Sequence, residues 1–433
     1  MRILLIATNR HHQLMSRMEA RPLPIGLAYV AGHLDPNRHT IKVLDLMFST
    51  DYLADTESIV REYQPDLIGI SIRNLDNQSY LDPQWALPVS REVVQRIRSI
   101  TRAPIVCGGP AFSILPRECF GFVEPDLGIA GDAGETFAQL ADRLEEGKPC
   151  DDLSGLVYRR GDEIIVQEQQ ASSAFPRPPR LEELDMAKYR QAGFGIAILT
   201  KLGSFSYPTA NTYNEESGGD AWRVIRPIEG VVDEAREMKQ RFGLRKVFFI
   251  DNSFNIPLPH AKSLCQSLIE ADLKLHWNTC LAPIPQACDA EIIGLMKRAG
   301  CSLVIMAGIG GHDDETTDIE ARFGPLREVG RLCEDGGLHY TISQYFGEPG
   351  ETRETVESKL AFLRSLQPAM ANLRIGVRVM PGTPVSQLAL QEGLIADESQ
   401  LIRPVFYIEE AVKDWIVDYL EAEAARNPRW NLF

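Results

Sequence analysis

The chain has 433 residues, too many for one ordinary domain, and its 44% hydrophobic and 24% charged residues are typical of a soluble globular protein. No apolar run approaches the roughly 20 residues of a membrane span and the N-terminus lacks signal-peptide features, so we expect a cytoplasmic protein without a membrane partner. A formal charge of −15 argues against nucleic acid as a partner, because an acidic chain displaces no counterions from a phosphate backbone.

The first third of the chain, residues 1–145, alternates short apolar strands with amphipathic helices. Strands are predicted at Arg2–Ala7, Thr40–Leu46, Leu67–Ile72, Pro104–Cys107 and Leu127–Ala130. Helices are predicted at Gly26–Leu34, Ser58–Tyr63 and Val89–Ile100. This alternation predicts an α/β fold with a doubly wound, Rossmann-like parallel sheet. Ligands of such sheets bind beyond the carboxyl ends of the strands, here the loops Thr8–Arg10, Ser71–Asn74, Gly108–Pro110 and Gly131–Glu135.

Residues 146–190 differ in character from the segments on either side. Gly155–Tyr158 and Glu163–Glu168 are typical of a small hairpin. Phe175–Arg180 reads FPRPPR, and such a density of proline forces an extended backbone. We expect a hairpin followed by a proline-rich linker.

A second alternation of strands and helices fills residues 191–390. Strands are predicted at Ile196–Thr200, Lys246–Ile250, Leu275–Cys280, Leu303–Ala307, Tyr340–Phe346 and Arg374–Val379. Six such units predict a full or partial β/α barrel, whose chemistry lies at the carboxyl ends of the strands. Residues 391–433 are predicted to form a small helical extension, with one helix over Ile408–Ala425.

The eight cysteines are scattered, and no pair has CxxC or zinc-ribbon spacing. We expect free thiols in a reducing compartment and no metal site.

Several collinear segments resemble the cobalamin-binding branch of the radical-SAM superfamily. In the first half these are PLPIGLAYVAGHL (Pro22–Leu34), CGGP (Cys107–Pro110) and GDAGE (Gly131–Glu135). The second half carries FFIDNSFN (Phe248–Asn255), MKRAGCSLVIMAGIG (Met296–Gly310), GEPGET (Gly347–Thr352) and MPGTPVSQLALQEGLI (Met380–Ile395). The resemblance covers nearly the whole chain, and it implies a cobalamin-binding domain followed by a radical-SAM-type barrel.

The chain departs from that family at the cluster motif. The family has CxxxCxxC after its first barrel strand, whereas Thr200–Asn214 contains no cysteine. Two alignments of the triad are open, one with Ser204, Pro208 and Asn211, the other with Gly203, Tyr207 and Ala210. None of these side chains is a good ligand for a 4Fe-4S cluster, so we expect no cluster. Gly310 stands where the family often has glutamate.

The resemblance implies a cobalamin site at the strand ends of the first domain. The candidate residues are Thr8, Asn9, Ser71, Gly108, Gly109, Gly131 and Gly134. The alternative is that the glycines serve tight turns alone, but their clustering on consecutive strand ends favours the cobalamin site. The family's lower-ligand motif DxHxxG is absent, and His11 and His12 stand in another frame, so we expect no histidine on cobalt.

The resemblance also implies a SAM site at the barrel mouth. Candidate catalytic residues are Asp251, Tyr207 and Glu348, and candidate SAM-binding residues are Asn211, Asn278, Gly308, Gly310, Gln344 and Arg378. Arg378 is predicted to pair with a carboxylate, and Asp251 or Glu348 with the SAM ammonium. Each of these side chains could instead have a purely structural role.

These expectations give an enzyme that binds SAM and cobalamin and carries out non-radical chemistry in a biosynthetic pathway. The reaction is either methyl transfer to a small-molecule substrate via cobalamin, or polar displacement or cyclisation on SAM itself. Two alternatives stay open: a catalytically inactive, cobalamin-carrying partner of an active paralogue, and a radical-SAM methyltransferase with atypical cluster ligands. The sequence leaves the oligomeric state undetermined.

Overall fold

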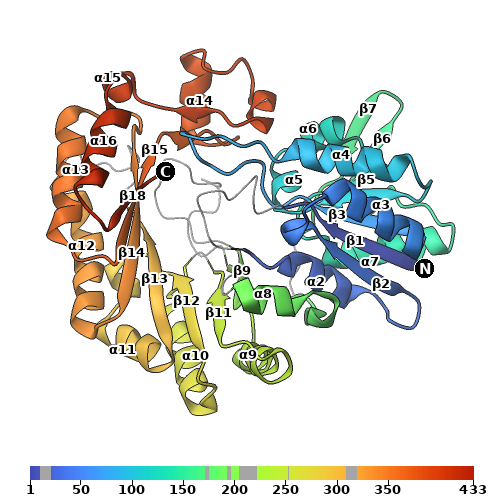
Figure 1. The fold of residues 1–433 in the computed structure, drawn as a ribbon, viewed down its shortest axis with the longest axis horizontal. Helices are drawn as coiled ribbons and strands as arrows, with labels where there is room; N and C mark the ends of the chain where they lie inside the picture. The colour runs from blue at the N-terminus through green and yellow to red at the C-terminus, as the bar shows by residue number, and fades with distance from the viewer. Residues whose placement is uncertain (10–20, 171–174, 193–196, 204–221, 252, 309–318) are drawn as a thin grey trace. The chain divides into compact units, whose positions relative to one another are not determined.

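The computed structural model describes the chain except residues 10–20, 171–174, 193–196, 204–221, 252 and 309–318 (Figure 1). The chain forms two compact units. Unit 1 comprises Met1–Gln78, Pro83–Ala192 and Ser399–Pro404, and unit 2 comprises Ser79–Asp82, Gly193–Glu398 and Val405–Phe433. Tyr207, Asn211 and Gly310 lie outside the described residues, so their predicted roles stay predictions.

Unit 1 is built on a seven-stranded sheet of order β2-β1-β3-β4-β5-β6-β7. The strands are β1 (Arg2–Ala7), β2 (Thr40–Asp45), β3 (Leu67–Ser71), β4 (Ile105–Gly108), β5 (Leu127–Ile129), β6 (Leu156–Arg160) and β7 (Glu163–Val166). The first five are parallel, and the β6–β7 hairpin continues the sheet in antiparallel fashion from β5. The predicted Rossmann-like fold is confirmed, and its order reverses between β1 and β3, where such sheets bind ligands.

The helices of unit 1 are α2 (Ile25–His33), α3 (Tyr52–Tyr63), α4 (Leu87–Arg98), α5 (Pro110–Ile114), α6 (Pro116–Val123), α7 (Ala133–Glu145) and α8 (Met186–Ala192). The sequence did not predict α5 and α6, each of which begins on a proline that needs no amide partner there. The predicted loop Gly131–Glu135 is wrong at its end, because α7 already begins at Ala133.

The proline-rich linker packs along α2. The amide of Arg180 donates to the carbonyl of Ala28 over 2.9 Å. A Cβ on Gly32 would lie 2.2 Å from the carbonyl oxygen of Pro178, so the backbones approach as closely as a glycine permits.

Unit 2 is built on seven parallel strands of order β18-β15-β14-β13-β12-β11-β8. They are β8 (Ala197–Ile198), β11 (Lys246–Phe249), β12 (His276–Cys280), β13 (Cys301–Ala307), β14 (His339–Phe346), β15 (Met370–Ile375) and β18 (Trp430–Leu432). Since β8 and β18 are the two edges, the sheet is a partial barrel. The helices α9 (Ile228–Phe242), α10 (Leu258–Ala271), α11 (Ala290–Arg298), α12 (Ile319–Gly336) and α13 (Arg353–Ser365) run along one face of it (Figure 1).

Two short antiparallel pairs accompany this sheet: β9 (Lys201–Gly203) with β10 (Trp222–Ile225), and β16 (Val377–Arg378) with β17 (Phe406–Tyr407). The predicted strand Arg374–Val379 is therefore wrong, because the barrel strand ends at Ile375 and Gly376 turns with φ 71°. Arg378 consequently lies on β16 and not at the end of a barrel strand.

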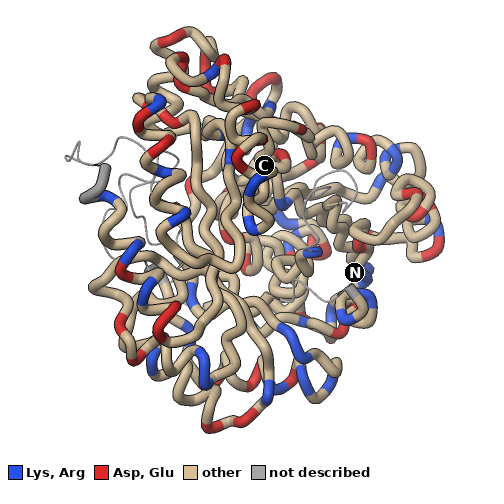
Figure 2. Tube along the Cα trace, turned by 60° about the vertical axis from the view of Figure 1, so that its left-hand side comes forward, with Lys and Arg blue, Asp and Glu red and all other residues tan. Residues whose placement is uncertain are grey.

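The predicted helical extension is wrong in part. After α14 (Pro384–Gln391), the tail forms α15 (Glu410–Lys413), α16 (Ile416–Ala425) and the strand β18, which pairs with β15. No helix among the described residues is long and apolar enough to cross a membrane. Acidic and basic residues are interspersed over the helices and loops (Figure 2).

Candidate functional sites

The carboxyl ends of β1 and β3 meet at a small polar cluster in unit 1. The hydroxyl of Thr8 lies 2.9 Å from that of Ser90 and 3.2 Å from the carbonyl oxygen of Ser71, to which it donates. Thr8 is 3% exposed and Asn9 8% exposed. Thr8 thus ties two strand ends together, and Ser71 and Asn9 stand where the strand order reverses.

Gly108 and Gly109 bring the end of β4 against its neighbours. Gly109 has φ 102°, and a Cβ there would lie 2.7 Å from the carbonyl oxygen of Ile72. A Cβ on Gly108 would lie 3.2 Å from the carbonyl oxygen of Ile129. The chain's own backbone therefore requires glycine at Gly109, whether or not a ligand approaches, whereas a side chain at Gly108 would need only a small shift of its neighbour.

Gly131 and Gly134 face side chains. The amide of Gly131 donates to the hydroxyl of Ser113 over 2.7 Å, and the side chain of Gln169 occupies the place of its missing Cβ. A Cβ on Gly134 would lie 2.7 Å from the ring of His33. Gln169 is flexible enough to move for a ligand, whereas the backbone beside Gly109 is not.

Sequence reasoning missed Asp45, the last residue of β2. Its carboxylate accepts from the amide of Met47 at 3.0 Å and from the hydroxyl of the fully buried Tyr189 on α8. Burial raises the pKa of Asp45, and the hydrogen bond from Tyr189 opposes that rise. The contact holds α8, the helix that follows the proline-rich linker, against the sheet. In the sequence, the only signal for Asp45 is its position at the end of a predicted strand.

In unit 2, Asp251 lies at the end of β11 with its carboxylate fully buried. One oxygen accepts from the amide of Thr200 at 3.1 Å and the other from the hydroxyl of Thr200. The ammonium of Lys201 lies 3.9 Å from this carboxylate and donates to the carbonyl of Phe254 over 3.0 Å. The sequence predicted Asp251 but missed Lys201, whose side chain is also fully buried.

Burial is the largest influence on the ionisation of this pair. It lowers the pKa of Lys201 to about 8, although Asp251 acts in the opposite direction. It raises the pKa of Asp251 against the effect of Lys201 and Thr200. Close by, burial lowers the pKa of His260 to about 4 and raises that of the Cys280 thiol to about 11.

Glu348, predicted as catalytic, is 2% exposed and takes part in an ion cluster. The ammonium of Lys359 lies 2.8 Å from Glu348 and 2.6 Å from Glu351, and donates to the carbonyl of Tyr345. Burial alone would lower the pKa of Lys359, but the two glutamates outweigh it and raise that pKa. A ligand ammonium would have to compete with Lys359 for Glu348.

Gly308 and Gln344 adjoin each other at the ends of β13 and β14. The amide of Gly308 donates to the carbonyl of Ser343 over 2.7 Å, and a Cβ on Gly308 would lie 2.2 Å from the amide oxygen of Gln344. Gln344 is fully buried, while Asn278 on β12 is half-buried. The guanidinium of Arg378, which is 2% exposed, donates to the carbonyl of Val379.

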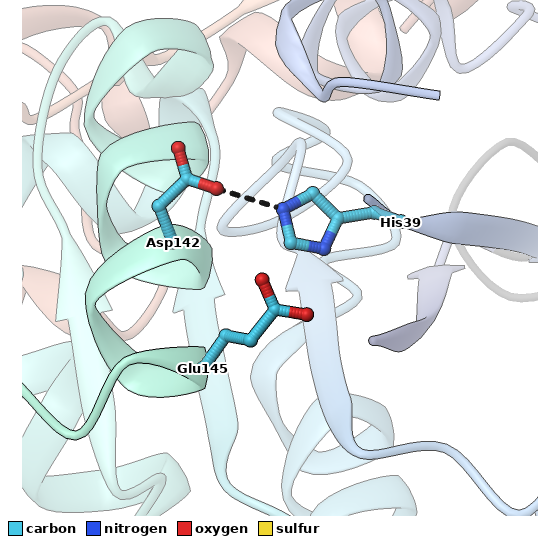
Figure 3. A group of neighbouring side chains, drawn as sticks. All are labelled: His39, Asp142 and Glu145. Carbon is cyan, nitrogen blue, oxygen red and sulfur yellow. Dashed lines mark hydrogen bonds and ion pairs between the residues drawn. The ribbon is translucent and has the colours of Figure 1, made fainter. Parts of the chain in front are cut away.

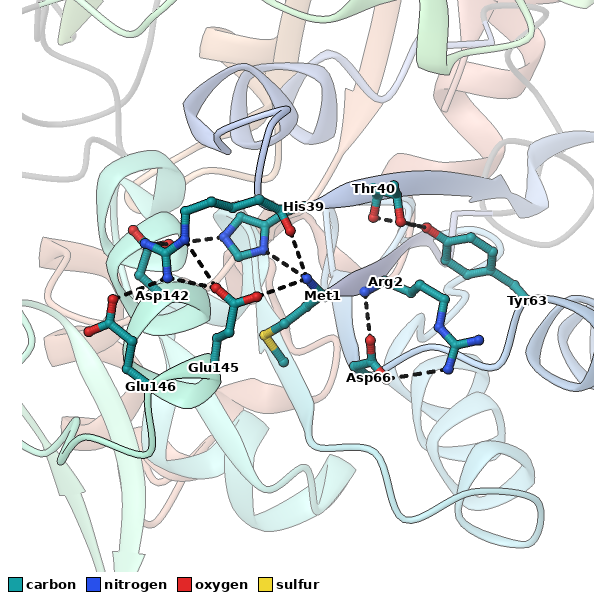
Figure 4. A network of polar contacts seen from close by, with 10 residues as sticks. Met1, Arg2, His39, Thr40, Tyr63, Asp66, Asp142, Glu145 and Glu146 are labelled. Atoms are coloured by element: carbon teal, nitrogen blue, oxygen red, sulfur yellow. Dashed lines mark hydrogen bonds and ion pairs between the residues drawn. The ribbon is translucent and has the colours of Figure 1, made fainter.

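One group of possible metal ligands occurs among the described residues, at the far end of unit 1's sheet from the strand-end loops: His39, Asp142 and Glu145 (Figure 3). The ring of His39 lies 3.0 Å from Asp142, and Arg38 lies 2.7 Å from Asp142 and 2.6 Å from Glu145 (Figure 4). The ammonium of Met1 lies 3.1 Å from Glu145. Cationic groups of the protein already neutralise these carboxylates, so the geometry favours an ion-pair network over a metal site.

Comparisons with known proteins agree with this architecture. Residues 14–141 match the B12 binding domain family. The chain is 24% identical to a tryptophan 2-C-methyltransferase of Streptomyces laurentii, over 83% of this chain and 70% of that protein. It is 22% identical to an uncharacterised methyltransferase of Pyrococcus horikoshii, over 91% and 84% of the two chains.

Among solved structures, the radical S-adenosylmethionine methyltransferase TsrM of Kitasatospora setae, with cobalamin and a [4Fe-4S] cluster bound, superposes with a TM-score of 0.83. That likeness covers 100% of this chain and 93% of the other at 21% identity. The chain has the two-domain fold of the cobalamin-binding radical-SAM proteins.

Unit 1 suits a cobalamin at its strand ends. Seryl and threonyl hydroxyls and closely packed glycine backbone line that edge, and such groups can hydrogen-bond the amide side chains of a corrin. Of the described histidines in this unit, His33 contacts the carbonyl of Tyr29 and His39 belongs to the ion-pair network. Both rings thus have partners within the protein, and His11 and His12 lie outside the described residues, so the absence of a histidine on cobalt stays a prediction.

Unit 2 lacks the cysteine triad that holds an iron–sulfur cluster in the family it resembles. No cysteine occurs between Cys150 and Cys265, which covers the whole place of the family's triad. The described cysteines of this unit have thiol pKa values raised by burial, which disfavours the thiolate that iron requires. Within the described part of the barrel, no three His, Cys, Asp or Glu side chains converge as metal ligands do.

Proposed function

We propose that this protein is a SAM- and cobalamin-binding methyltransferase that works without an iron–sulfur cluster. The observation that carries the proposal is a combination: the complete two-unit fold, a B12 binding domain match, and no cysteine from 151 to 264. The curated relatives whose names state a reaction are methyltransferases, which favours methyl transfer over other SAM chemistry.

The chemistry needs no radical. The sulfonium of SAM is already a good leaving group, so orientation and exclusion of water can provide much of the acceleration. Bound cobalamin would supply a cobalt centre able to carry a methyl group. The protein's own residues would orient the ligands: the strand ends of unit 1 for the corrin, and Asp251, Lys201 and Gln344 for SAM.

Polar displacement or cyclisation on SAM itself is a second candidate, favoured by the buried carboxylate of Asp251, which could accept a proton. The two reactions differ in product. Methyl transfer leaves S-adenosylhomocysteine, whereas displacement at the aminocarboxypropyl chain leaves methylthioadenosine.

The test is anaerobic purification of the full chain with hydroxocobalamin, iron and sulfide, followed by metal analysis and an absorption spectrum. We expect one cobalt per chain, a base-off corrinoid spectrum and no stoichiometric iron. Calorimetry with SAM should then show binding. Stoichiometric iron with a broad visible band would overturn the cluster-free proposal, and absence of both corrinoid and SAM binding would favour an inactive partner protein.

A further inference from the structure

The pair of Lys201 and Asp251 places opposite charges side by side inside the barrel. Their side chains follow the carboxyl ends of β8 and β11, the edge at which barrels of this kind bind ligands. The two charged groups are 3.9 Å apart, beyond hydrogen-bond reach. Both are fully buried, so each contributes a desolvated charge.

Asp251 is oriented by Thr200 and by the backbone amide of Lys201, and not by the ammonium of that lysine. Thr200 donates to both carboxylate oxygens, from its amide and from its hydroxyl. Lys201 instead directs a hydrogen bond to the carbonyl of Phe254 and lies 5.8 Å from the centre of that residue's ring. The separation between the two charges is therefore fixed by other contacts, and it matches the spacing of an amino group and a carboxylate on one carbon.

We propose that Lys201 and Asp251 bind the zwitterionic α-amino-acid end of a ligand, with Lys201 contacting its carboxylate and Asp251 its ammonium. The inference rests on the proposed function, which supplies two sources of that group: SAM, and an amino-acid substrate. A zwitterion complements the pair because each of its charges meets an opposite one, and no net charge is brought into the barrel.

Ligand binding should be coupled to protonation of Lys201. The pKa of Lys201 is about 8, so near that pH about half of the molecules hold a neutral amine, and a carboxylate beside it would favour the ammonium. Among the described residues, the titratable groups that face the pair are His260 on α10 and Cys280 on β12, with pKa values of about 4 and about 11. Neither changes its protonation near pH 8, so a proton taken up on binding reports on Lys201.

The experiment is calorimetry of the full chain with SAM at pH 8, in two buffers of different ionisation enthalpy. Wild type should take up about half a proton per SAM. Lys201→Met should lose this uptake and bind SAM at least about 30-fold more weakly, as expected when one member of a buried charge pair is removed. Lys201→Arg keeps the charge without titrating, so it should bind SAM without proton uptake. Lys246→Met, at an exposed lysine of β11, should behave as wild type.

Decarboxylated SAM lacks only the carboxylate, so it tests the contribution of that group to binding. It should bind Lys201→Met no more weakly than wild type, because its ammonium is repelled by Lys201, and it should cause no proton uptake that depends on Lys201. Tryptophan is the second probe: uptake with tryptophan and not with SAM would assign the pair to the substrate's amino-acid group.

Wild-type affinity and uptake in Lys201→Met, with its circular dichroism unchanged, would overturn the inference and leave the proposed function standing. The same holds if Arg378→Ala, and not Lys201→Met, abolishes the preference for SAM over decarboxylated SAM. If wild type binds neither SAM nor tryptophan, the proposed function fails and the inference with it.

Discussion

The buried amine of Lys201 makes the stability of the barrel depend on pH, in a direction set by its lowered pKa. The pKa of Lys201 falls from an ordinary 10.5 to about 8 on folding. Between these values the unfolded chain binds more protons than the folded one, so the free energy of unfolding rises with pH. Below pH 8 both states carry the proton, and this dependence vanishes.

We therefore expect wild type to gain about 1–2 kcal/mol relative to Lys201→Met between pH 8 and about 9.5. Urea unfolding at several pH values, followed by far-UV circular dichroism, measures this difference. Parallel curves for the two proteins across that range would mean that the amine is not desolvated in the folded state.

The contact between Tyr189 and Asp45 has the opposite dependence. Burial raises the pKa of Asp45, so the folded state holds its proton to a higher pH than the unfolded state, and stability falls as pH rises above about 3.8. The Tyr189 hydroxyl limits this loss of stability, because it donates a hydrogen bond to the ionised carboxylate of Asp45.

Tyr189→Phe should cost about 1–2 kcal/mol near pH 8, where the buried carboxylate loses one of its two donors and keeps only the amide of Met47, and less near pH 5. Tyr63→Phe is the control, since that exposed hydroxyl donates to the carbonyl and hydroxyl oxygens of Thr40 and to no carboxylate. Denaturant unfolding at both pH values measures the effect, and an equal loss at the two pH values would contradict the prediction.

At the scale of elements, α2 contains two glycines with contrasting surroundings. A Cβ on Gly32 would meet the Pro178 carbonyl at 2.2 Å, and backbone cannot yield as a side chain can. A Cβ on Gly26 would meet nothing within 4 Å. Gly32 leaves room for the backbone of the linker to pack against α2, whereas Gly26 only lowers the helix propensity of α2.

Gly32→Ala should therefore lower the stability of unit 1 by about 1–3 kcal/mol and raise the rate of proteolysis in the proline-rich linker. Gly26→Ala should leave the linker protected and stabilise the helix by up to about 1 kcal/mol. Thermal unfolding and limited trypsin digestion of both variants provide the comparison. Equal protection of the linker in the two would show that it does not depend on α2.

The elements that the sequence predicted well are the parallel strands of the first unit. β1 matches its prediction at both ends, because a strand buried on both faces is a continuous apolar run bounded by polar residues. The prediction failed at β15, where the apolar pattern continues past the turn at Gly376, and at β18, which has three residues and depends on β15 for its pairing.

The candidate sites were predictable to the extent that parallel strands place their ends at one edge. That rule brought Asp251, Gly308 and Gln344 into consideration, and the contact between Gly308 and Gln344 follows from neighbouring strand ends. The sequence could not indicate that Glu348 would pair with Lys359, eleven residues further on, or that Lys201 would be buried. Burial of a lysine depends on packing from β11 and its following loop, which no local pattern encodes.

At the scale of the whole molecule, the units are not simple consecutive stretches of chain. Ser79–Asp82 belongs to unit 2 and Ser399–Pro404 to unit 1, although the chain on either side belongs to the other unit. The domain limits predicted at 145, 190 and 390 follow changes in composition and in the pattern of strands and helices along the chain. Such changes could not indicate that a short segment belongs to the unit formed by a distant part of the chain. The C-terminal strand is a further long-range element, since it adds a seventh strand to a sheet that begins at residue 197.

Trp430 is the buried aromatic residue of the tail strand β18. It is 6% exposed, pairs with Ala371 of β15, and has the guanidinium of Arg364 over its ring at 5.6 Å. Trp430→Ala should cost about 3–4 kcal/mol, the range found when a buried aromatic side chain is removed. Trp415→Ala, in the same tail but half-buried against Arg353, should cost less.

Hydrogen exchange followed by mass spectrometry shows which elements lose stability in the Trp430→Ala variant. In Trp430→Ala, peptides of β15 and α16 should exchange faster, because β15 loses its edge partner and α16 packs on β18. Peptides of β1 and β3, in the other unit, should keep their protection because they have a separate core. Faster exchange in both units would instead show that the tail strand stabilises the molecule as one cooperative body.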